Sequence, residues 1–263
     1  MTGFVGSIPA LYDRHMGPVL FEPYAHQLAR RLPPSATRVL EIAAGTGRVT
    51  RQLLARLPAT AELTVTDLNE PMLVEARRQI GDDPRATWRT TDVQALPFGD
   101  AVFEVIVFAF GLMFVPDKAR AMRELHRVLG PGGTLILATW DSLDRNPASH
   151  VLHDLAMASC PADPPTFMAL PFSMGDPEVL RELARAAGFA GGAVETIELA
   201  SEAVSADDLA TGFVRGNPLW NQLVERGVDG AAFQAQVTAA LIARFGDRPC
   251  RSPISAHVLV AAR

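Results

Sequence analysis

The sequence predicts an α/β fold built on a doubly wound, mainly parallel sheet. Apolar strand-like runs alternate along the chain with runs in which apolar residues recur at helical spacing. A turn containing Gly45 and Gly47 joins the first of these strands to the helix that follows it. Acidic residues close successive strands, at the edge of a parallel sheet where ligands bind.

The expected elements follow one another in a regular order. Strands are predicted at 38–44, 62–68, 86–93, 103–110 and 134–140. Helices are predicted between them, at 47–57, at 71–80 with a proline in the first turn, and at 117–129. The run Gly-Pro-Gly-Gly at 130–133 should break the last of these helices. A helix at 176–189 and a terminal strand pair, 193–200 with 256–263, complete the sheet.

Three further segments do not follow this alternation of strands and helices. Residues 1–33, 141–175 and 201–251 are expected to gather over the open edge of the sheet as helical lid elements. Ordinary peripheral packing is the alternative interpretation. The core of this single domain would then comprise about 34–140, 176–200 and 252–263.

Composition restricts the partners. The 263 residues carry a net charge of −5, which gives no basic surface for nucleic acid. The apolar runs are too short to span a bilayer, and no basic-then-apolar leader precedes them. Cys160 and Cys250 stand alone, so neither a disulfide framework nor a zinc site is indicated. We expect a cytoplasmic monomer or homodimer whose partner is a small molecule, not a nucleic acid or a membrane.

Carboxylates at three strand ends indicate the kind of ligand. Asp67 suits a ribose diol, because a carboxylate accepts two hydroxyl hydrogens, and Asp92 could accept from an adenine amine. Together with Glu41 they would repel a pyrophosphate and favour a ligand bearing a sulfonium and an ammonium group. This pattern predicts S-adenosylmethionine, with Glu41 orienting its amino group. Taken singly, each carboxylate could instead be structural, as a strand-end group, a helix cap or a turn residue.

Longer stretches carry a family resemblance. VLEIAAGTGR, VTDLNEPML, TDVQALPFGDAVFEVIVFAFGLMFVPD and RAMRELHRVLGPGGTLILATW resemble successive motifs of class I S-adenosylmethionine-dependent methyltransferases, covering roughly 35–140. The resemblance is to the small-molecule branch, which includes quinone-biosynthesis and natural-product enzymes. It implies a Rossmann-like sheet of seven strands with the last strand antiparallel.

The same resemblance implies a set of cofactor contacts. Gly45 and Gly47 would lie beside the amino-acid end of the cofactor, and Asp67 would hold the ribose. The contacts implied around the adenine are Leu68, Met72, Asp92 and Val93, and those around the methionine are Phe108, Ala109, Phe110 and the covering Tyr12. Ala43 departs from the family, which usually has glycine there, and its methyl group narrows the approach of the backbone to the cofactor.

The acceptor side is less defined. Methyl transfer from a sulfonium needs a base only when the nucleophile must lose a proton of high pKa. His15, His150 and His153 are the candidates in the expected lid. The last two are spaced for metal ligation, but no third ligand is clear and no metal site is expected. Aromatic and methionine side chains of the lid predict an apolar or aromatic acceptor, although core packing explains most of them equally well: Phe21, Met157, Phe167, Met168, Phe172, Met174, Phe213 and Trp220.

The function predicted is methyl transfer from S-adenosylmethionine to an oxygen, nitrogen or carbon atom of a small molecule. A non-methylating reaction in the same pocket, such as a cyclisation, and a non-catalytic cofactor-binding partner remain alternatives. A nicotinamide dehydrogenase is disfavoured by Glu41, by Asp92 and by Thr50, which occupies the place of the third glycine.

Overall fold

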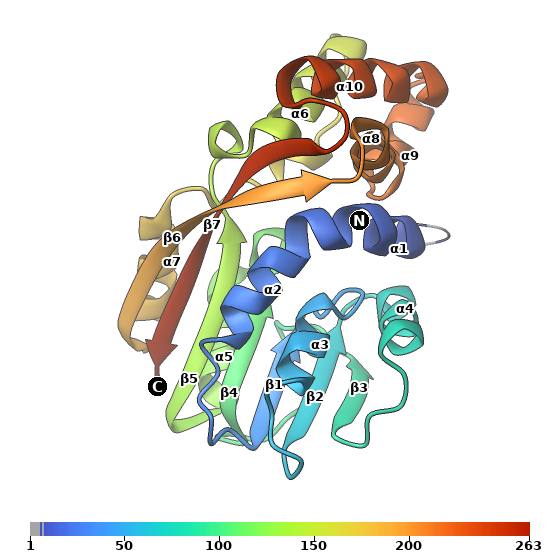
Figure 1. Ribbon diagram of the computed structural model, residues 1–263. Coiled ribbons are helices and arrows are strands. Elements are labelled where there is room, and N and C mark those ends of the chain that lie inside the picture. The colour runs from blue at the N-terminus through green and yellow to red at the C-terminus, as the bar shows by residue number, and fades with distance from the viewer. Residues whose placement is uncertain (1–5, 7) are drawn as a thin grey trace.

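A computed structural model of the chain describes residue 6 and residues 8–263, and its centre is a seven-stranded sheet (Figure 1). The strands lie in the order β3-β2-β1-β4-β5-β7-β6. β7, the last strand in the sequence, runs antiparallel to both of its neighbours, and the other pairings are parallel. The predicted doubly wound sheet is therefore confirmed. The strands are β1 Arg38–Ile42, β2 Glu62–Asp67, β3 Ala86–Thr90, β4 Phe103–Ala109, β5 Leu129–Trp140, β6 Ala190–Ala203 and β7 Cys250–Ala262.

Helices connect the strands and gather at one end of the sheet. Figure 1 shows α6, α8, α9 and α10 together beyond the carboxyl ends of the parallel strands, with the N-terminal helices between them and the sheet. The α-helices are α1 Ile8–Leu11, α2 Glu22–Ala29, α3 Arg48–Leu54, α4 Glu70–Ile80, α5 Lys118–Val128, α6 Pro147–Ser159, α7 Pro177–Ala186, α8 Ala206–Arg215, α9 Leu219–Glu225 and α10 Gly230–Phe245. Short 3₁₀ turns are η2 Leu112–Phe114, η3 Leu143–Arg145 and η4 Phe167–Ala169. None of the helices in the described residues is long and apolar enough to cross a membrane.

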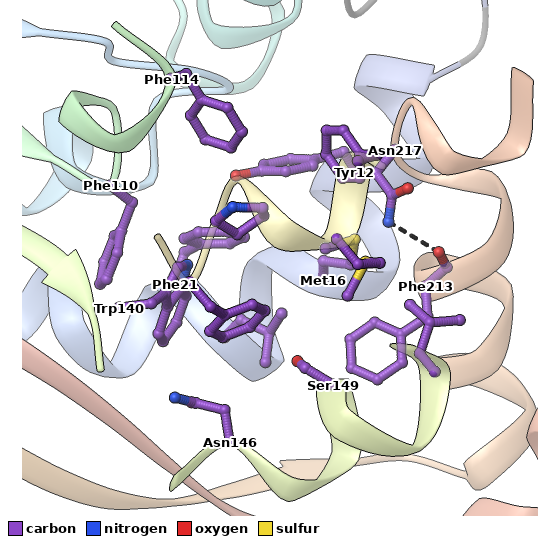
Figure 2. A pocket seen from close by; sticks show the side chains of 16 residues that line it. Tyr12, Met16, Phe21, Phe110, Phe114, Trp140, Asn146, Ser149, Phe213 and Asn217 are labelled. Atoms are coloured by element: carbon purple, nitrogen blue, oxygen red, sulfur yellow. Dashed lines mark hydrogen bonds between the residues drawn. The ribbon is translucent and has the colours of Figure 1, made fainter. Parts of the chain in front are cut away.

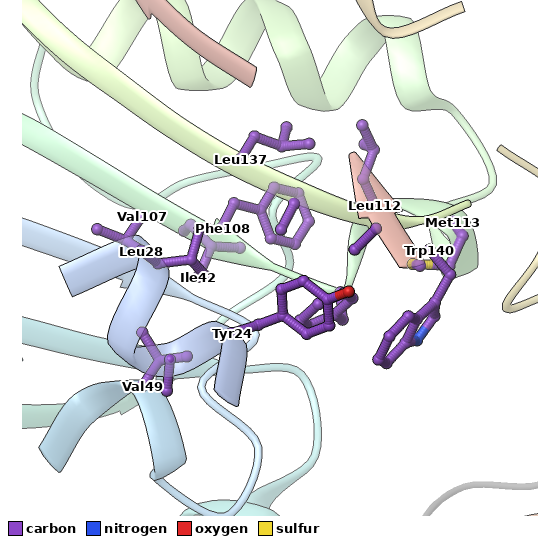
Figure 3. Packing of buried hydrophobic residues seen from close by; sticks show 14 of the residues in the cluster. Tyr24, Leu28, Ile42, Val49, Val107, Phe108, Leu112, Met113, Leu137 and Trp140 are labelled. Carbon is purple, nitrogen blue, oxygen red and sulfur yellow. The ribbon is translucent and has the colours of Figure 1, made fainter. Parts of the chain in front are cut away.

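The centre of the sheet is buried on both faces. β1 pairs with β4 in register Val39 to Val105, and both strands are buried along most of their length, as expected for central parallel strands. In Figure 3 the α2 side chains Tyr24 and Leu28 lie over this part of the sheet. The hydroxyl of Tyr24 donates to carbonyl oxygens of β6 and β7, at 2.8 and 3.1 Å, so α2 ties the edge of the sheet to its centre.

The strand predicted at 86–93 ends at Thr90, and two longer strands also differ from the sequence prediction. The Gly-Pro-Gly-Gly run does not separate helix from strand: α5 ends at Val128 and β5 begins at Leu129, with a register shift against β4 between Phe103 and Val105. The glycines therefore form an irregularity inside a longer strand. β6 and β7 also continue into the expected helical segment, pairing as far as Ala203 with Cys250, because backbone pairing extends past the apolar residues that marked these strands.

Residues Tyr12–Phe21 form a π-helix, η1, which crosses above the first strand-to-helix turn. An ion pair fixes it there: the Asp13 carboxylate accepts from Nε and Nη2 of Arg48, both at 2.8 Å, and from the Thr46 hydroxyl at 2.9 Å. A Cβ atom at Gly17 would lie 2.6 Å from Arg48 Nε, so only glycine lets η1 pass this close. η1 is thereby anchored to the turn after β1.

Candidate functional site

A cavity of about 540 Å³ lies at the carboxyl ends of β1, β2 and β4. This is the place where open α/β sheets bind ligands. Most of the residues predicted to bind a cofactor line it: Tyr12, Ala43, Gly45, Asp67, Leu68, Met72, Asp92, Val93, Phe108, Ala109 and Phe110. The structure thus brings together residues from five separate stretches of the sequence, four of them at strand ends and one, Tyr12, near the N-terminus.

Gly47 does not line this cavity. Its φ is +85°, and a Cβ atom there would lie 2.7 Å from Ile80 Cδ1 and 3.1 Å from the Ala76 Cβ. The residue therefore begins α3 in a left-handed conformation and lets that helix pack against α4. Gly45, with φ +57° and open space around its α-carbon, is the glycine that faces the cavity.

Glu41 also lies behind the cavity wall and not in it. Only 1% of its surface is exposed, and neither carboxylate oxygen makes a hydrogen bond of ordinary geometry with the described residues. Burial raises the pKa of Glu41 to about 8, the carboxylate of Asp67 adds to this rise, and the nearby Thr50 opposes part of it. An unpaired carboxylate in such a position is costly, and a nearby cation would relieve that cost.

Asp67 ties the turn after β1 to the end of β2. Its Oδ2 accepts from the Gly45 backbone N–H at 2.9 Å, and its Oδ1 accepts from the Asn69 backbone N–H at 2.8 Å. Burial raises the pKa of Asp67, and these hydrogen bonds lower it. A carboxylate has about four lone-pair sites, so this side chain keeps capacity for a ligand hydroxyl. This geometry is compatible with a structural role for Asp67 in the turn and with a role in binding a ligand.

Asp92 lies at the exposed rim of the cavity. Its Oδ1 accepts from the Gln94 backbone N–H at 2.8 Å, which makes it a turn residue as well as a cavity residue. Val93, next to it, is buried.

Two non-glycine residues with left-handed backbone flank the cavity. Ala43 has φ +54° and Phe110 has φ +53°, each costing roughly 1–2 kcal/mol relative to an unstrained conformation. Ala43 thus takes a conformation that glycine adopts freely, at the position where the family resemblance leads us to expect glycine. A Cβ atom at Gly111 would lie only 2.5 Å from the Ala43 Cβ, so the ends of β1 and β4 nearly touch here. Strain of this kind is typical of functional sites.

A second, inner cavity of about 70 Å³ shares one wall with the first. The residues common to both are Tyr12, Phe21, Phe110, Phe114 and Phe167. Figure 2 shows Phe110 and Trp140 on one side of this cavity and Phe213 with Ser149 on the other. Phe110 stacks on Trp140, with ring centroids 4.2 Å apart. The two cavities are therefore neighbours separated by aromatic rings.

The π-helix explains how Tyr12 and Phe21 share this wall. A π-helix has roughly 4.4 residues per turn against about 3.6 in an α-helix, so residues nine apart return to the same side of it. The rings of Tyr12 and Phe21 are stacked, 4.9 Å apart. In an α-helix they would lie on opposite sides. Burial raises the pKa of Tyr12 well above its usual range, so its hydroxyl stays protonated.

Two polar side chains of the inner cavity wall also form hydrogen bonds that hold the fold together. Asn217 donates to the Phe213 carbonyl oxygen at 2.8 Å and accepts from the Leu219 backbone N–H at 2.9 Å. Asn146 accepts from the Ser255 backbone N–H at 3.0 Å and so links α6 to β7. The cavity wall is otherwise dominated by apolar side chains.

The predicted acceptor-side residues divide into two groups. Phe21, Phe167, Met168, Phe172 and Phe213 line the inner cavity. Met157, Met174 and Trp220 line neither cavity. A Cβ atom at Gly230 would lie 2.2 Å from the Trp220 ring, so that indole packs against the start of α10.

The structure does not bring the three candidate bases to either cavity wall. His15 is buried with its Nδ1 2.9 Å from Asp208 Oδ1, a contact that joins η1 to α8. His150 and His153 lie on α6 beside Asp154. Sequence spacing placed these histidines in the expected lid but contained no signal for the direction of their rings.

Known proteins share both the sequence motifs and the fold. Residues 39–133 match a family model described as a methyltransferase domain. A ubiquinone/menaquinone biosynthesis C-methyltransferase (UbiE) of Dinoroseobacter shibae is 38% identical over 126 residues, which are 47% of this chain and 50% of that protein. The chain spans about half the length of the C-methyltransferases of this kind that it matches.

Solved structures extend the likeness of fold to nearly the whole chain. The YcgJ protein of Bacillus subtilis has a TM-score of 0.58 at 16% identity, covering 92% of this chain and 98% of that one. Phosphoethanolamine N-methyltransferase 2 of Haemonchus contortus, solved with S-adenosyl-L-methionine, has a TM-score of 0.62 at 14% identity, covering 100% of this chain and 58% of that one. Residues 39–133 are therefore similar to a methyltransferase domain, and nearly the whole chain shares its fold with these solved structures.

Proposed function

We propose that this chain binds S-adenosylmethionine in the large cavity and transfers its methyl group to a small apolar or aromatic acceptor in the inner one. The observation that supports this most directly is the large cavity at the strand ends, whose wall contains Asp67 and Asp92 and behind which the buried side chain of Glu41 lacks a hydrogen-bond partner in the described part of the chain. A cofactor with a sulfonium, an ammonium and an adenosine group fits such a donor set, whereas a dinucleotide pyrophosphate does not.

The cofactor contacts follow from the cavity wall. Asp67 would accept from the ribose hydroxyls, and Asp92 with Val93 would meet the adenine edge between Leu68 and Met72. Gly45 and Ala43 would face the amino-acid end, Phe108, Ala109 and Phe110 would lie below the methionine, and Tyr12 would cover it. Each of these side chains lines the cavity, which supports the assignment.

The bound sulfonium would supply an electrophilic methyl group with a good leaving group. The task of the protein is then to align the acceptor with the methyl–sulfur bond and to exclude water. The five aromatic side chains common to the two cavities stand where this alignment has to occur. Helices from 1–33, 141–175 and 201–251 would act as the lid over the core of 34–140, 176–200 and 252–263.

The nature of the acceptor is also part of the proposal. The apolar wall of the inner cavity supports an apolar or aromatic acceptor, and the net charge of −5 argues against nucleic acid. The relative from Dinoroseobacter shibae is named for C-methylation in ubiquinone and menaquinone biosynthesis, which supports a quinone-related ring with a carbon nucleophile. We place this activity in the cytoplasm.

A turnover assay tests the proposed reaction. The protein is incubated with S-adenosylmethionine and a panel of hydroquinones and naphthols, with sugar phosphates and nucleotides as polyanionic counterparts. We expect S-adenosylhomocysteine and a methylated ring compound, both measured by mass spectrometry. Methylation confined to the polyanionic compounds would refute the apolar acceptor. Cofactor that binds but is never demethylated with any acceptor would argue for the non-methylating alternative.

Cofactor affinity is expected to depend on pH through Glu41. Its pKa of about 8 makes the side chain mainly protonated at pH 7, and a nearby cation favours the ionised form, so binding releases a proton. Affinity should rise by up to about tenfold per pH unit below pH 8 and level off above it, because one proton is released. Calorimetry in buffers of different ionisation enthalpy measures both quantities. In Glu41→Gln the proton release should vanish, and its persistence there would assign the effect to another group.

A further inference from the structure

Three side chains of α6 that could bind a metal ion lie close together and line neither cavity. Asp154 Oδ1 is 3.5 Å from His150 Nε2 and 3.2 Å from His153 Nδ1. One donor atom from each of these three residues lies within 4.8 Å of the other two. The histidines are three residues apart and Asp154 follows directly, so a single helical turn presents all three.

The separations between donors suit a tetrahedral ion. Zinc binds imidazole nitrogen and carboxylate oxygen at about 2.0–2.2 Å, so two ligands of a tetrahedral site lie roughly 3.3–3.5 Å apart. The two carboxylate–imidazole distances already match this spacing. The Asp154 side chain is 67% exposed, and the two imidazoles are 28–31% exposed, so an ion can reach them from solvent.

A second carboxylate lies beside one of these histidines. Asp144 Oδ1, in η3, lies 3.2 Å from His150 Nδ1, on the opposite side of the ring from Nε2. A proton held on Nδ1, beside the Asp144 carboxylate, would leave the lone pair of Nε2 free at 3.5 Å from Asp154 Oδ1. Metal-binding histidines are held in this way by carboxylates.

We propose that His150, His153 and Asp154 form a binding site for zinc(II) or a similar divalent transition metal ion, with Asp144 positioning His150. Two imidazoles and one carboxylate leave a fourth position for water, and they select against magnesium, which prefers oxygen ligands. In the sequence, His150 and His153 had no clear third ligand. In the structure, Asp154 lies close enough to both to be that ligand. The ion would bind to one turn of α6, the helix whose residues Ser149 and Leu152 line the inner cavity.

Titration calorimetry of the untagged protein with zinc chloride at pH 7.5 tests this site. We expect one zinc ion per chain and no saturable binding of magnesium chloride. His150→Ala and His153→Ala should each weaken zinc binding at least about tenfold, and Asp144→Asn should weaken it about 10- to 100-fold if it orients His150. His26→Ala is the matched control, since His26 is an exposed histidine on α2 beside Glu22 and should leave binding unchanged.

Circular dichroism establishes that the variants are folded, and cobalt(II) provides an independent readout through the visible absorption of a tetrahedral site. Wild-type protein without saturable zinc binding would overturn the proposal. Equal binding by wild type and His150→Ala, or an equal loss in His26→Ala, would do so as well. The test requires no methyl acceptor, so its outcome is independent of the proposed methyl transfer.

Discussion

Arg48→Met is expected to destabilise the protein by about 3–5 kcal/mol, because it leaves the buried carboxylate of Asp13 without its partner. Asp13 is only 4% exposed and receives two guanidinium hydrogen bonds at 2.8 Å. Urea unfolding followed by circular dichroism measures the change. The same substitution should loosen η1 and with it Tyr12 and Phe21 at the cavity wall.

Two variants provide the controls for this prediction. Arg251→Met breaks an ion pair with Glu202 at 2.8 Å in which both side chains are more than half exposed, so it should cost no more than about 1 kcal/mol. Combining Asp13→Asn with Arg48→Met removes both charges and should recover much of the lost stability. A cost for Arg48→Met as small as that for Arg251→Met would contradict the described anchoring of η1.

Asp67→Ala is expected to weaken S-adenosylmethionine binding by about 1–3 kcal/mol, or roughly 5- to 150-fold. The substitution removes an acceptor proposed for the ribose and also frees the backbone N–H groups of Gly45 and Asn69, which shape the turn. Calorimetry with the cofactor measures the change.

Asp67→Asn separates the two effects, because it keeps the size of the side chain and one acceptor oxygen but loses the charge. Asp82→Ala, an exposed carboxylate after α4, should bind the cofactor as the wild type does. Unchanged affinity in a folded Asp67→Ala protein would remove Asp67 from the site.

The sheet and the rim of the cavity were predictable because they depend on local pattern. Apolar runs such as residues 103–110 indicate buried strands whatever the rest of the fold is. Parallel strands then bring their carboxyl ends to one edge of the sheet. Asp67 and Asp92 therefore line the cavity, as expected. The glycine turn was correctly located, but which of its glycines faces a ligand depends on how α3 packs against α4, a contact that the local sequence does not encode.

Tyr12 and Phe21 were expected at the site, but the way in which they form one N-terminal wall could not be predicted, for a different reason. Tyr12 and Phe21 share a face only because η1 is wound as a π-helix, and the anchors of that helix, Arg48 and Asp208, lie far along the chain. Glu41 was identified as the acidic group near the turn, but its burial behind the wall depends on the packing around β1. Long-range contacts decide both features.

The common wall of Tyr12 and Phe21 has an energetic consequence. Since one helix holds both rings and both rings line both cavities, a molecule that displaces either ring from one cavity would also change the wall of the other. The affinities of the two occupants then become thermodynamically coupled, and such coupling is reciprocal: whatever the cofactor does for acceptor binding, the acceptor does equally for the cofactor.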